Sequence, residues 1–247
     1  MDCTGAVALV TGGAKRVGRA IVSELAAAGC DVAVHFRDSQ REAEDAVRCV
    51  RQLGRRSISV RAELGDPAEW RPLVDRAVSE LGALDLLVNN ASLFLTDLSD
   101  DIESFDVSHW ERMLRVNLLA PAALCHYASS ALRAGGRGVI VNLCDISAER
   151  PWSRHLAYCA SKAGLVNLTR SLAKALAPQV RVVGVAPGIA IFPEQYDQQI
   201  RQRRVERVPM GRGGSPEEVA KLVRFLVESG DYVTGQVVAI DGGRMLA

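Results

Sequence analysis

Three polar side chains in residues 141–164 have types and spacing that suit proton transfer. Tyr158 and Lys162 stand four residues apart, which puts them on one face of a helix, and Asp145 precedes Tyr158 by 13 residues. A tyrosine with an unperturbed pKa of about 10 is a weak base at neutral pH, and a nearby ammonium lowers that pKa. The pair therefore predicts a proton donor for a carbonyl or imine that receives hydride.

The carboxylate of Asp145 narrows the choice of substrate. A serine hydroxyl can donate a hydrogen bond to a ketone oxygen, whereas an ionised aspartate only accepts. Facing a carbonyl, Asp145 would repel the negative charge developing on oxygen unless it stayed protonated. It suits a substrate with N–H donors, such as an amino-substituted heterocycle; alternatively, a raised pKa lets it share a proton with Tyr158. Either arrangement makes ketone reduction the less natural chemistry.

Strands and helices alternate along the chain and would have to position these residues. Apolar strands are expected at residues 7–10, 32–34, 57–60, 84–88, 139–143, 180–185 and 237–240. Amphipathic helices are expected at residues 17–28, 41–53, 67–81, 107–133, 157–177, 194–206 and 216–229. Continuous Val/Ile/Leu strands between helices predict an α/β Rossmann fold, a doubly wound parallel sheet with helices on both faces. We expect a single domain, residues 1–247, in which the irregular segment 186–212 is a substrate lid.

Composition argues against several classes of function. Hydrophobic residues make up 48% of the 247 residues, and a formal net charge of +1 gives no reason to expect nucleic acid or an acidic membrane as partner. No apolar run reaches the roughly 20 residues of a spanning helix, and the N-terminus has no basic signal-peptide start, so a cytoplasmic location is expected. The six cysteines are scattered, which predicts free thiols and no metal site. His155 lies near Cys159, but a nucleophilic cysteine is not expected.

A glycine-rich turn, TGGAKRVG at residues 11–18, follows the first strand and opens the first helix. Glycines let the backbone approach a pyrophosphate, and the helix N-terminus supplies N–H groups and a positive dipole. The strand–turn–helix context favours a dinucleotide site over an ordinary tight turn.

The end of the second strand, VHFRDS, discriminates between nicotinamide cofactors. A site that prefers NAD usually offers an acid there to the adenosine ribose. Phe36 stands about where that acid would be, and Arg37 and Ser39 follow with a guanidinium and a hydroxyl that suit a 2′-phosphate. Arg16 adds a second cation near the phosphates. The sequence therefore predicts NADPH; the alternative is that Arg37 is a solvated surface arginine, and Asp38 is a counter-indication.

Further segments at strand ends complete a pattern. NNAS starts at Asn89, Asn117 lies on the long helix, PG occupies residues 187–188, and DGG ends the last strand at residues 241–243. With the Y-x-x-x-K pair, these features in this order resemble the short-chain dehydrogenase/reductase family over essentially the whole chain.

The resemblance implies a role for each catalytic residue. In that family the tyrosine is the acid and base, and the lysine grips the nicotinamide ribose and tunes the tyrosine. The asparagine holds a water that relays protons. These roles carry over to Tyr158, Lys162 and Asn117, and the fourth catalytic position, usually a serine, is Asp145 here.

Within the family the sequence resembles the pteridine reductases. These have an arginine in the glycine turn, matching Arg16, and Asn-Ala-Ser followed by an aromatic residue, matching the segment that ends at Phe94. They also have an aspartate in place of the serine, matching Asp145. Phe94 could stack on a flat pterin or simply pack in the core or lid, and Arg16 could reach the pterin edge or bind phosphate alone. The lid resembles bacterial members of the branch better than parasite ones.

Two sets of contacts are expected. The predicted cofactor contacts are Gly12, Arg16, Val17, Gly18, His35, Phe36, Arg37, Ser39, Glu63, Leu64, Asn90, Ala91, Ser92, Tyr158, Lys162, Pro187 and Gly188. The predicted substrate contacts are Arg16, Ser92, Phe94, Asp145 and Tyr158. Glu194 and Tyr196 in the lid are further candidates, which a solvated helix start explains equally well.

The resemblance implies an NADPH-dependent reductase of a dihydropterin of the dihydrobiopterin, dihydromonapterin or dihydrofolate type. A 3-oxoacyl-thioester or general carbonyl reductase is the first rival. A non-catalytic NADPH-binding sensor is the second, against which the intact proton-transfer residues argue. The resemblance also implies a homotetramer formed by the helices at 107–133 and 157–177; Trp110 and the apolar run 118–124 fit such an interface and equally fit the core.

Overall fold

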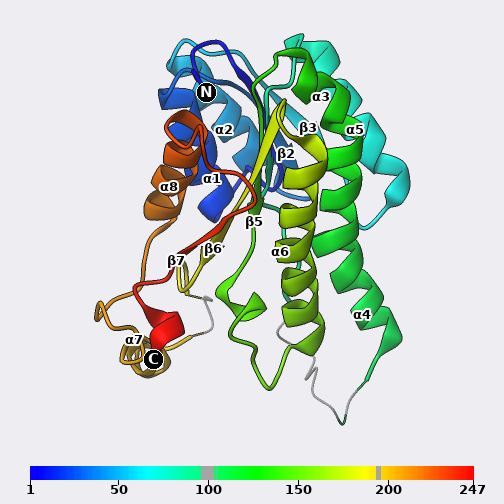
Figure 1. Ribbon diagram of the computed structural model, residues 1–247. Helices are drawn as coiled ribbons and strands as arrows, with labels where there is room; N and C mark the ends of the chain where they lie inside the picture. The colour runs from blue at the N-terminus through cyan, green and yellow to red at the C-terminus, as the bar shows by residue number, and fades with distance from the viewer. Residues whose placement is uncertain (96–102, 104, 193–195) are drawn as a thin grey trace.

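The computed structural model describes residues 1–95, 103, 105–192 and 196–247 (Figure 1). Parallel strands form one seven-stranded sheet in the order β3-β2-β1-β4-β5-β6-β7. The strands are β1 (Val7–Val10), β2 (Asp31–Phe36), β3 (Ser57–Arg61), β4 (Leu86–Asn89), β5 (Gly138–Leu143), β6 (Val180–Pro187) and β7 (Val237–Ile240). The strand order reverses between β1 and β4, so their carboxyl ends open the crevice where such sheets bind ligands. The predicted doubly wound α/β fold is confirmed.

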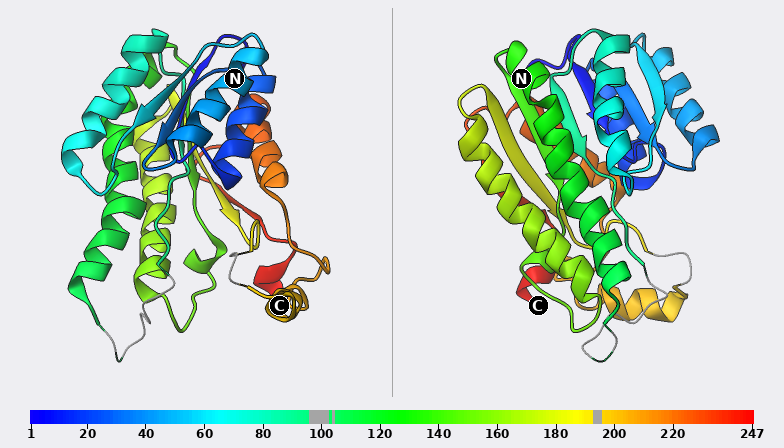
Figure 2. Two further views of the ribbon diagram at one scale, coloured as in Figure 1. Left: turned by 180° about the vertical axis from the view of Figure 1, so that it is seen from behind. Right: turned by 90° about the vertical axis from the view of Figure 1, so that its right-hand side faces the viewer.

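Helices cover both faces of the sheet (Figures 1 and 2). On one face lie α1 (Arg16–Ala27), α2 (Gln40–Gln52) and α8 (Pro216–Glu228). On the other lie α3 (Trp70–Leu81), α5 (Ala120–Ala134) and α6 (Leu156–Leu176), with α4 (Val107–Leu114) continuing the line of α5 past the sheet. Shorter elements are η1 (Pro67–Glu69), η2 (Arg115–Leu119), η3 (Ile146–Ala148), α7 (Gln198–Val205) and η4 (Arg244–Leu246).

In the central strands the side chains alternate between two hydrophobic cores, one on each face of the sheet. In β1, Ala8 and Val10 pack under α1 and α8, whereas Val7 and Leu9 pack under α3 and α5. All four are at most 1% exposed, so both faces of the strand are apolar. Burying a side chain of the size of Leu9 stabilises the fold by roughly 1.5–3 kcal/mol.

The long helix expected at residues 107–133 is interrupted. The segment η2 is π-helical, and the N–H of Ala120 donates to the carbonyl of Arg115, five residues back. Pro121 follows and has no N–H, so it cannot supply the donor that a regular α-helix would give to the carbonyl of Asn117. The apolar periodicity continues through this break, which is why the sequence predicted one helix.

Two helix starts were also predicted wrongly. The helix expected at residues 67–81 begins as the 3₁₀ turn η1, because Asp66 accepts the N–H of Ala68 there. The helix expected at 194–206 begins only at Gln198, where Asp197 accepts the N–H of Ile200 as N-cap. Glu194 lies outside the described residues. In the part of the chain that is described, no helix combines the length and apolarity needed to cross a membrane.

Candidate active site

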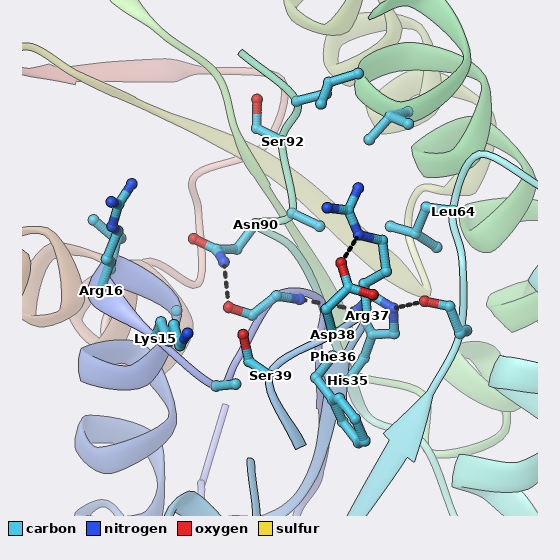
Figure 3. A pocket seen from close by; sticks show the side chains of 18 of the residues that line it. Lys15, Arg16, His35, Phe36, Arg37, Asp38, Ser39, Leu64, Asn90 and Ser92 are labelled. Atoms are coloured by element: carbon cyan, nitrogen blue, oxygen red, sulfur yellow. Dashed lines mark hydrogen bonds and ion pairs between the residues drawn. The ribbon is translucent and has the colours of Figure 1, made fainter. Parts of the chain in front are cut away.

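A cavity of about 490 Å³ opens at the carboxyl ends of β1, β2 and β4 (Figure 3). Predicted cofactor contacts supply most of its lining: Gly12, Arg16, Val17, Gly18, His35, Phe36, Arg37, Ser39, Glu63, Leu64, Asn90, Ala91 and Ser92. The sequence analysis missed Ala14, Lys15, Asp38, Ala62, Leu93, Val116 and Ile191. Most of these adjoin a predicted residue, but Val116 and Ile191 arrive from the long helix and the expected lid, and no local motif marks them.

The glycine-rich turn requires glycine at two positions. A Cβ on Gly18 would lie 2.1 Å from the carbonyl oxygen of Gly12, which no side chain could tolerate. Gly12 itself has φ +62°, and a Cβ there would come within 3.1 Å of the Cα of Ala91. The turn is thus a cradle of bare backbone pressed against the end of β4, as expected for a pyrophosphate site.

His35 fixes this turn to the sheet. The Gly12 N–H donates to His35 Nδ1 at 3.0 Å, so His35 Nε2 carries the proton and donates to the Ala62 carbonyl, also at 3.0 Å. Burial lowers the pKa of His35 to about 4, so the ring is neutral at neutral pH. His35 lines the cavity as predicted, and its hydrogen bonds show that it also orients the turn.

Two helix N-termini beside the cavity are left available for an anion. Lys15 before α1 and Ser39 before α2 make no side-chain capping bond within the described residues. By contrast, Asp106, Asp197 and Ser215 cap α4, α7 and α8 with their own side chains. Uncapped N-termini present N–H groups and positive dipole ends, which suit the phosphates of a dinucleotide.

At the expected 2′-phosphate site, Arg37 already lies beside two acidic side chains. Arg37 Nε lies 2.5 Å from Asp38 Oδ2 and 3.7 Å from Glu63 Oε2. These groups are exposed, so the pairs are weak and an incoming phosphate could displace them. Phe36 is buried and no acid takes its place, which agrees with the predicted preference for the phosphorylated cofactor.

Tyr158 and Asp145 meet directly. The Tyr158 hydroxyl donates to Asp145 Oδ2 at 3.1 Å, while Asp145 Oδ1 accepts the Ser147 N–H at 2.7 Å and caps η3. Burial raises the pKa of Tyr158 well above its ordinary value, and the charge and hydrogen bond of Asp145 raise it further. The pKa of Tyr158 thus shifts in the direction opposite to the lowering expected beside Lys162, and the phenol is held as a proton donor.

Lys162 is buried on the face of α6 that carries Tyr158. Its Nζ donates to the carbonyl of Leu143 at 2.9 Å and lies 5.7 Å from the centre of the Tyr158 ring. Burial lowers the pKa of Lys162, and Asp145 opposes that change. The Leu143 carbonyl at the end of β5 accepts one of the three ammonium N–H groups, so the other two remain for a ribose or a water.

Asn117 is 1% exposed and holds the loop that carries Ser92 and Phe94. Its Oδ1 accepts the Leu93 N–H at 2.7 Å and its Nδ2 donates to the Leu93 carbonyl at 2.9 Å. Nδ2 also donates to Ser161 Oγ at 3.1 Å on α6. The Asn117 side chain therefore positions this loop. The main-chain carbonyl of Asn117 has no helical donor because Pro121 lacks an N–H, so this carbonyl is the group that could hold the predicted water.

Aromatic rings enclose the tyrosine. Phe94, 38% exposed, packs edge-on against Tyr158 with ring centres 4.8 Å apart, and its ring centre lies 4.9 Å from that of His155. Trp152 stacks on Tyr158 at 5.9 Å and 13°. The sequence analysis missed Trp152 and considered His155 only as a neighbour of Cys159, because nothing beyond their place between Asp145 and Tyr158 marks them.

The remaining predicted contacts lie off this cavity. Tyr158, Lys162, Pro187 and Gly188 are absent from its lining as described. The Gly188 N–H donates to the Ile240 carbonyl at 3.0 Å, and a Cβ there would come within 2.9 Å of the Asp241 backbone, which fixes the turn at the end of β6. Among the described residues no group of three or more His, Cys, Asp or Glu could hold a metal ion, and all six cysteines are free thiols.

Known sequences match nearly the entire chain. The model of a family described as enoyl-(acyl carrier protein) reductase matches residues 12–244. A cis-4-hydroxycyclohexanecarboxylate dehydrogenase of Sinomonas cyclohexanicum is 36% identical over 96% of this chain and 95% of its own. A 3-oxoacyl-[acyl-carrier-protein] reductase of Staphylococcus aureus is 30% identical over 96% of each chain.

Solved structures match the fold closely. The alternative dihydrofolate reductase 1 (FolM) of Brucella canis, crystallised with NADP, is 36% identical and superposes with a TM-score of 0.92. The match covers 100% of this chain and 96% of that one.

Proposed function

The chain belongs to the short-chain dehydrogenase/reductase family of oxidoreductases, and from this premise we propose that it uses NADPH to reduce a dihydropterin to the tetrahydro form. The similar Brucella protein is named a dihydrofolate reductase and was crystallised with NADP, which supports both halves of the proposal. The glycine cradle, the uncapped helix N-termini and the absence of an acid at Phe36 fit the phosphorylated cofactor.

One observation supports the pterin over a ketone: the Tyr158 hydroxyl donates to Asp145 at 3.1 Å. A carboxylate beside the proton donor is repelled by a developing oxyanion but accepts from ring N–H and amino groups. A pterin offers such donors along one edge. The same carboxylate keeps Tyr158 protonated, as a reaction that adds a proton requires.

Each residue has a defined task in this reaction. The glycine cradle would hold NADPH, which would supply the hydride for the C=N carbon of the pterin's pyrazine ring. Tyr158 donates the proton to the ring nitrogen, and Lys162 with a water at the Asn117 carbonyl replaces it. Asp145 orients the pterin N–H groups, and Phe94, partly exposed beside Tyr158, can turn its face to the flat ring.

A substrate panel tests the proposal. NADPH oxidation is followed with dihydrobiopterin, dihydromonapterin, dihydrofolate and 3-oxoacyl thioesters, using wild type and the Asp145→Ser variant. We expect turnover of dihydropterins by wild type, and a loss of about 100-fold in Asp145→Ser with little change in NADPH affinity. Replacing Tyr158 by Phe should abolish turnover of every substrate. Equal pterin kinetics in wild type and Asp145→Ser would remove the role given to the carboxylate.

The rival activity is reduction of a 3-oxoacyl thioester, which the Staphylococcus aureus relative's name supports. It predicts ketone turnover without dihydropterin turnover in the same panel. It also predicts that Asp145→Ser gains activity with thioesters, because the serine hydroxyl can donate to the ketone oxygen.

We further infer that residues 186–212 close over the substrate and that the protein works as a cytoplasmic homotetramer. Ile191 from the first part of this segment reaches the cofactor cavity. Leu119, at the middle of the long helix, is 50% exposed, whereas Ala120 and Leu124 of the same run are buried core. Sedimentation of the protein would report the assembly directly.

A further inference from the structure

Four arginines gather around the turn that carries Asp145. Arg150 follows η3, Arg204 lies on α7, Arg207 follows that helix, and Arg244 begins η4. Figure 1 shows α7 and the C-terminus at the same end of the molecule, beyond the carboxyl ends of the strands. The proposed reaction assigns none of these four side chains a task.

Contacts between three segments bring the arginines together. Arg150 Nη1 donates to the main-chain carbonyl of Arg244 at 2.8 Å. The Met210 N–H donates to the Gly242 carbonyl at 3.1 Å, and a Cβ on Gly242 would lie 2.7 Å from Val208 Cγ1. The segment that begins with Arg207 is therefore packed against the turn that ends in Arg244.

Ion pairs within the described part of the chain do not neutralise this cluster. None of the four arginines forms an ion pair within the residues that the structure describes, although Arg204 lies over the Tyr196 ring at 5.8 Å. Burial lowers the pKa of Arg244, and the charges of the other three arginines lower it further, with Asp145 opposing. Arg212 in the same segment, by contrast, is paired with Glu218 at 2.6 Å. Like charges held this close favour the arrival of an anion.

The cluster adjoins the reacting end of the site. The Arg150 N–H donates to the Ile146 carbonyl at 2.9 Å, which ties Arg150 to the turn that Asp145 caps. Met245, next to Arg244, packs against the buried group that contains Ile146. None of the four arginines lines the cofactor cavity, so an anion held here would belong to the substrate.

We propose that Arg150, Arg204, Arg207 and Arg244 form a binding site for an acidic tail of the substrate, a carboxylate or phosphate on a chain attached to the heterocycle. The inference rests on the proposed function, because it places the heterocycle at Asp145. Guanidinium groups bind both anions through paired N–H donors. The site selects pterins with acidic tails, such as dihydrofolate or a pterin phosphate, over pterins with neutral side chains.

Matched substrates test the site. The KM values of dihydrofolate, its tail diamide, dihydroneopterin phosphate and dihydrobiopterin are measured for wild type, Arg204→Gln, Arg207→Gln and Arg244→Gln. Each substitution should raise the KM of the charged substrates by about tenfold and leave those of the neutral substrates and the NADPH affinity unchanged. Comparing the KM change of dihydrofolate with that of dihydroneopterin phosphate shows whether the site prefers a carboxylate or a phosphate. Added salt should raise the KM of the charged substrates alone.

Arg203→Gln is the matched control, since Arg203 is next to Arg204 on α7 but is not among the charges that mainly shift the pKa of Arg244. It should leave every KM unchanged. Equal wild-type KM values for dihydrofolate and its diamide would overturn the inference, as would variants that weaken charged and neutral substrates alike.

A separate measurement distinguishes failure of the site from failure of the proposed function. Equilibrium binding of p-aminobenzoylglutamate and of inorganic phosphate needs no turnover. If no dihydropterin is reduced, the function fails; binding lost in Arg204→Gln and Arg244→Gln but kept in Arg203→Gln still supports the anion site. Binding that is equal in all these proteins, or absent from wild type, overturns it.

Discussion

At the scale of the residue, the environment of Tyr158 decides how it acts. The sequence predicted its partnership with Lys162 and Asp145, because spacing on a helix and a motif are readable from residue types. The direction in which the pKa of Tyr158 shifts could not be predicted from the sequence. It depends on burial and on the 3.1 Å contact with Asp145, which only the packed structure brings about.

This contact predicts the pH dependence of the reaction. Asp145→Asn keeps the side-chain shape and removes the charge that raises the pKa of Tyr158. Because a raised pKa keeps the phenol protonated, losing the contribution of Asp145 should move the alkaline fall of the reduction rate to lower pH. The pH–rate profile measures this, and absorbance titration of the phenol checks it without substrate. Glu149→Gln, which removes an exposed acid of the same segment, should leave the profile unchanged; an identical shift there would contradict the assignment to Asp145.

His35 gives a second prediction, for stability. Its pKa is about 4 in the folded protein and about 6.5 unfolded, so the unfolded chain binds the extra proton between these values. The neutral ring therefore contributes stability above pH 6.5 that is lost as the pH falls toward 4, roughly 3 kcal/mol in all. Denaturant unfolding of wild type and His35→Gln across this range should show a flatter curve in the variant.

The exposed His126 provides the control for this measurement. His126→Gln should follow the wild-type curve, because it removes an exposed imidazole and leaves His35 in place. Parallel curves for wild type and His35→Gln would show that the burial of His35 carries no such free energy.

At the scale of the element, sequence periodicity predicted where strands and helices lie but not where a helix changes its pattern. The π-helical η2 was not predicted because the apolar spacing continues through it, although Pro121 is evident in the sequence. The 3₁₀ start at η1 and the late start of α7 depend on side-chain caps at Asp66 and Asp197. Local capping competes with helix propensity, and the sequence alone does not show which wins.

Pro121→Ala tests what η2 contributes. The alanine N–H can bond the Asn117 carbonyl in a regular helix, which occupies the group proposed to hold the relay water. We expect kcat to fall by about tenfold with NADPH affinity retained, because positioned proton transfer contributes about 10²–10⁴-fold and the relay is one part of it. Steady-state kinetics and cofactor binding together measure this. Ser130→Ala, at an exposed site of α5, is the control, and an unchanged kcat in Pro121→Ala would argue against the carbonyl.

At the scale of the whole molecule, the order of strands explains why distant motifs form one site. Residues from the turn after β1, the end of β2 and the end of β4 meet because these parallel strands are neighbours and the strand order reverses between β1 and β4. The fold rule predicted that convergence from sequence. It could not predict Ile191 or the arginines around Arg244, which reach their places through irregular chain and tertiary packing.

The same convergence predicts how cofactor binding stabilises the protein. A ligand that binds only the folded chain at 100 times its Kd stabilises it by about 2.7 kcal/mol, or roughly 5–10 °C in melting temperature for a chain of this length. NADPH should reach this shift at lower concentration than NADH, because Arg37 and the uncapped α2 N-terminus can bind its 2′-phosphate. Arg37→Gln should then reduce the NADPH shift alone, whereas Arg48→Gln on the outer part of α2 should change neither. Equal shifts with both cofactors in wild type would contradict the preference for NADPH and would indicate that Asp38 and Glu63 keep Arg37 from the 2′-phosphate.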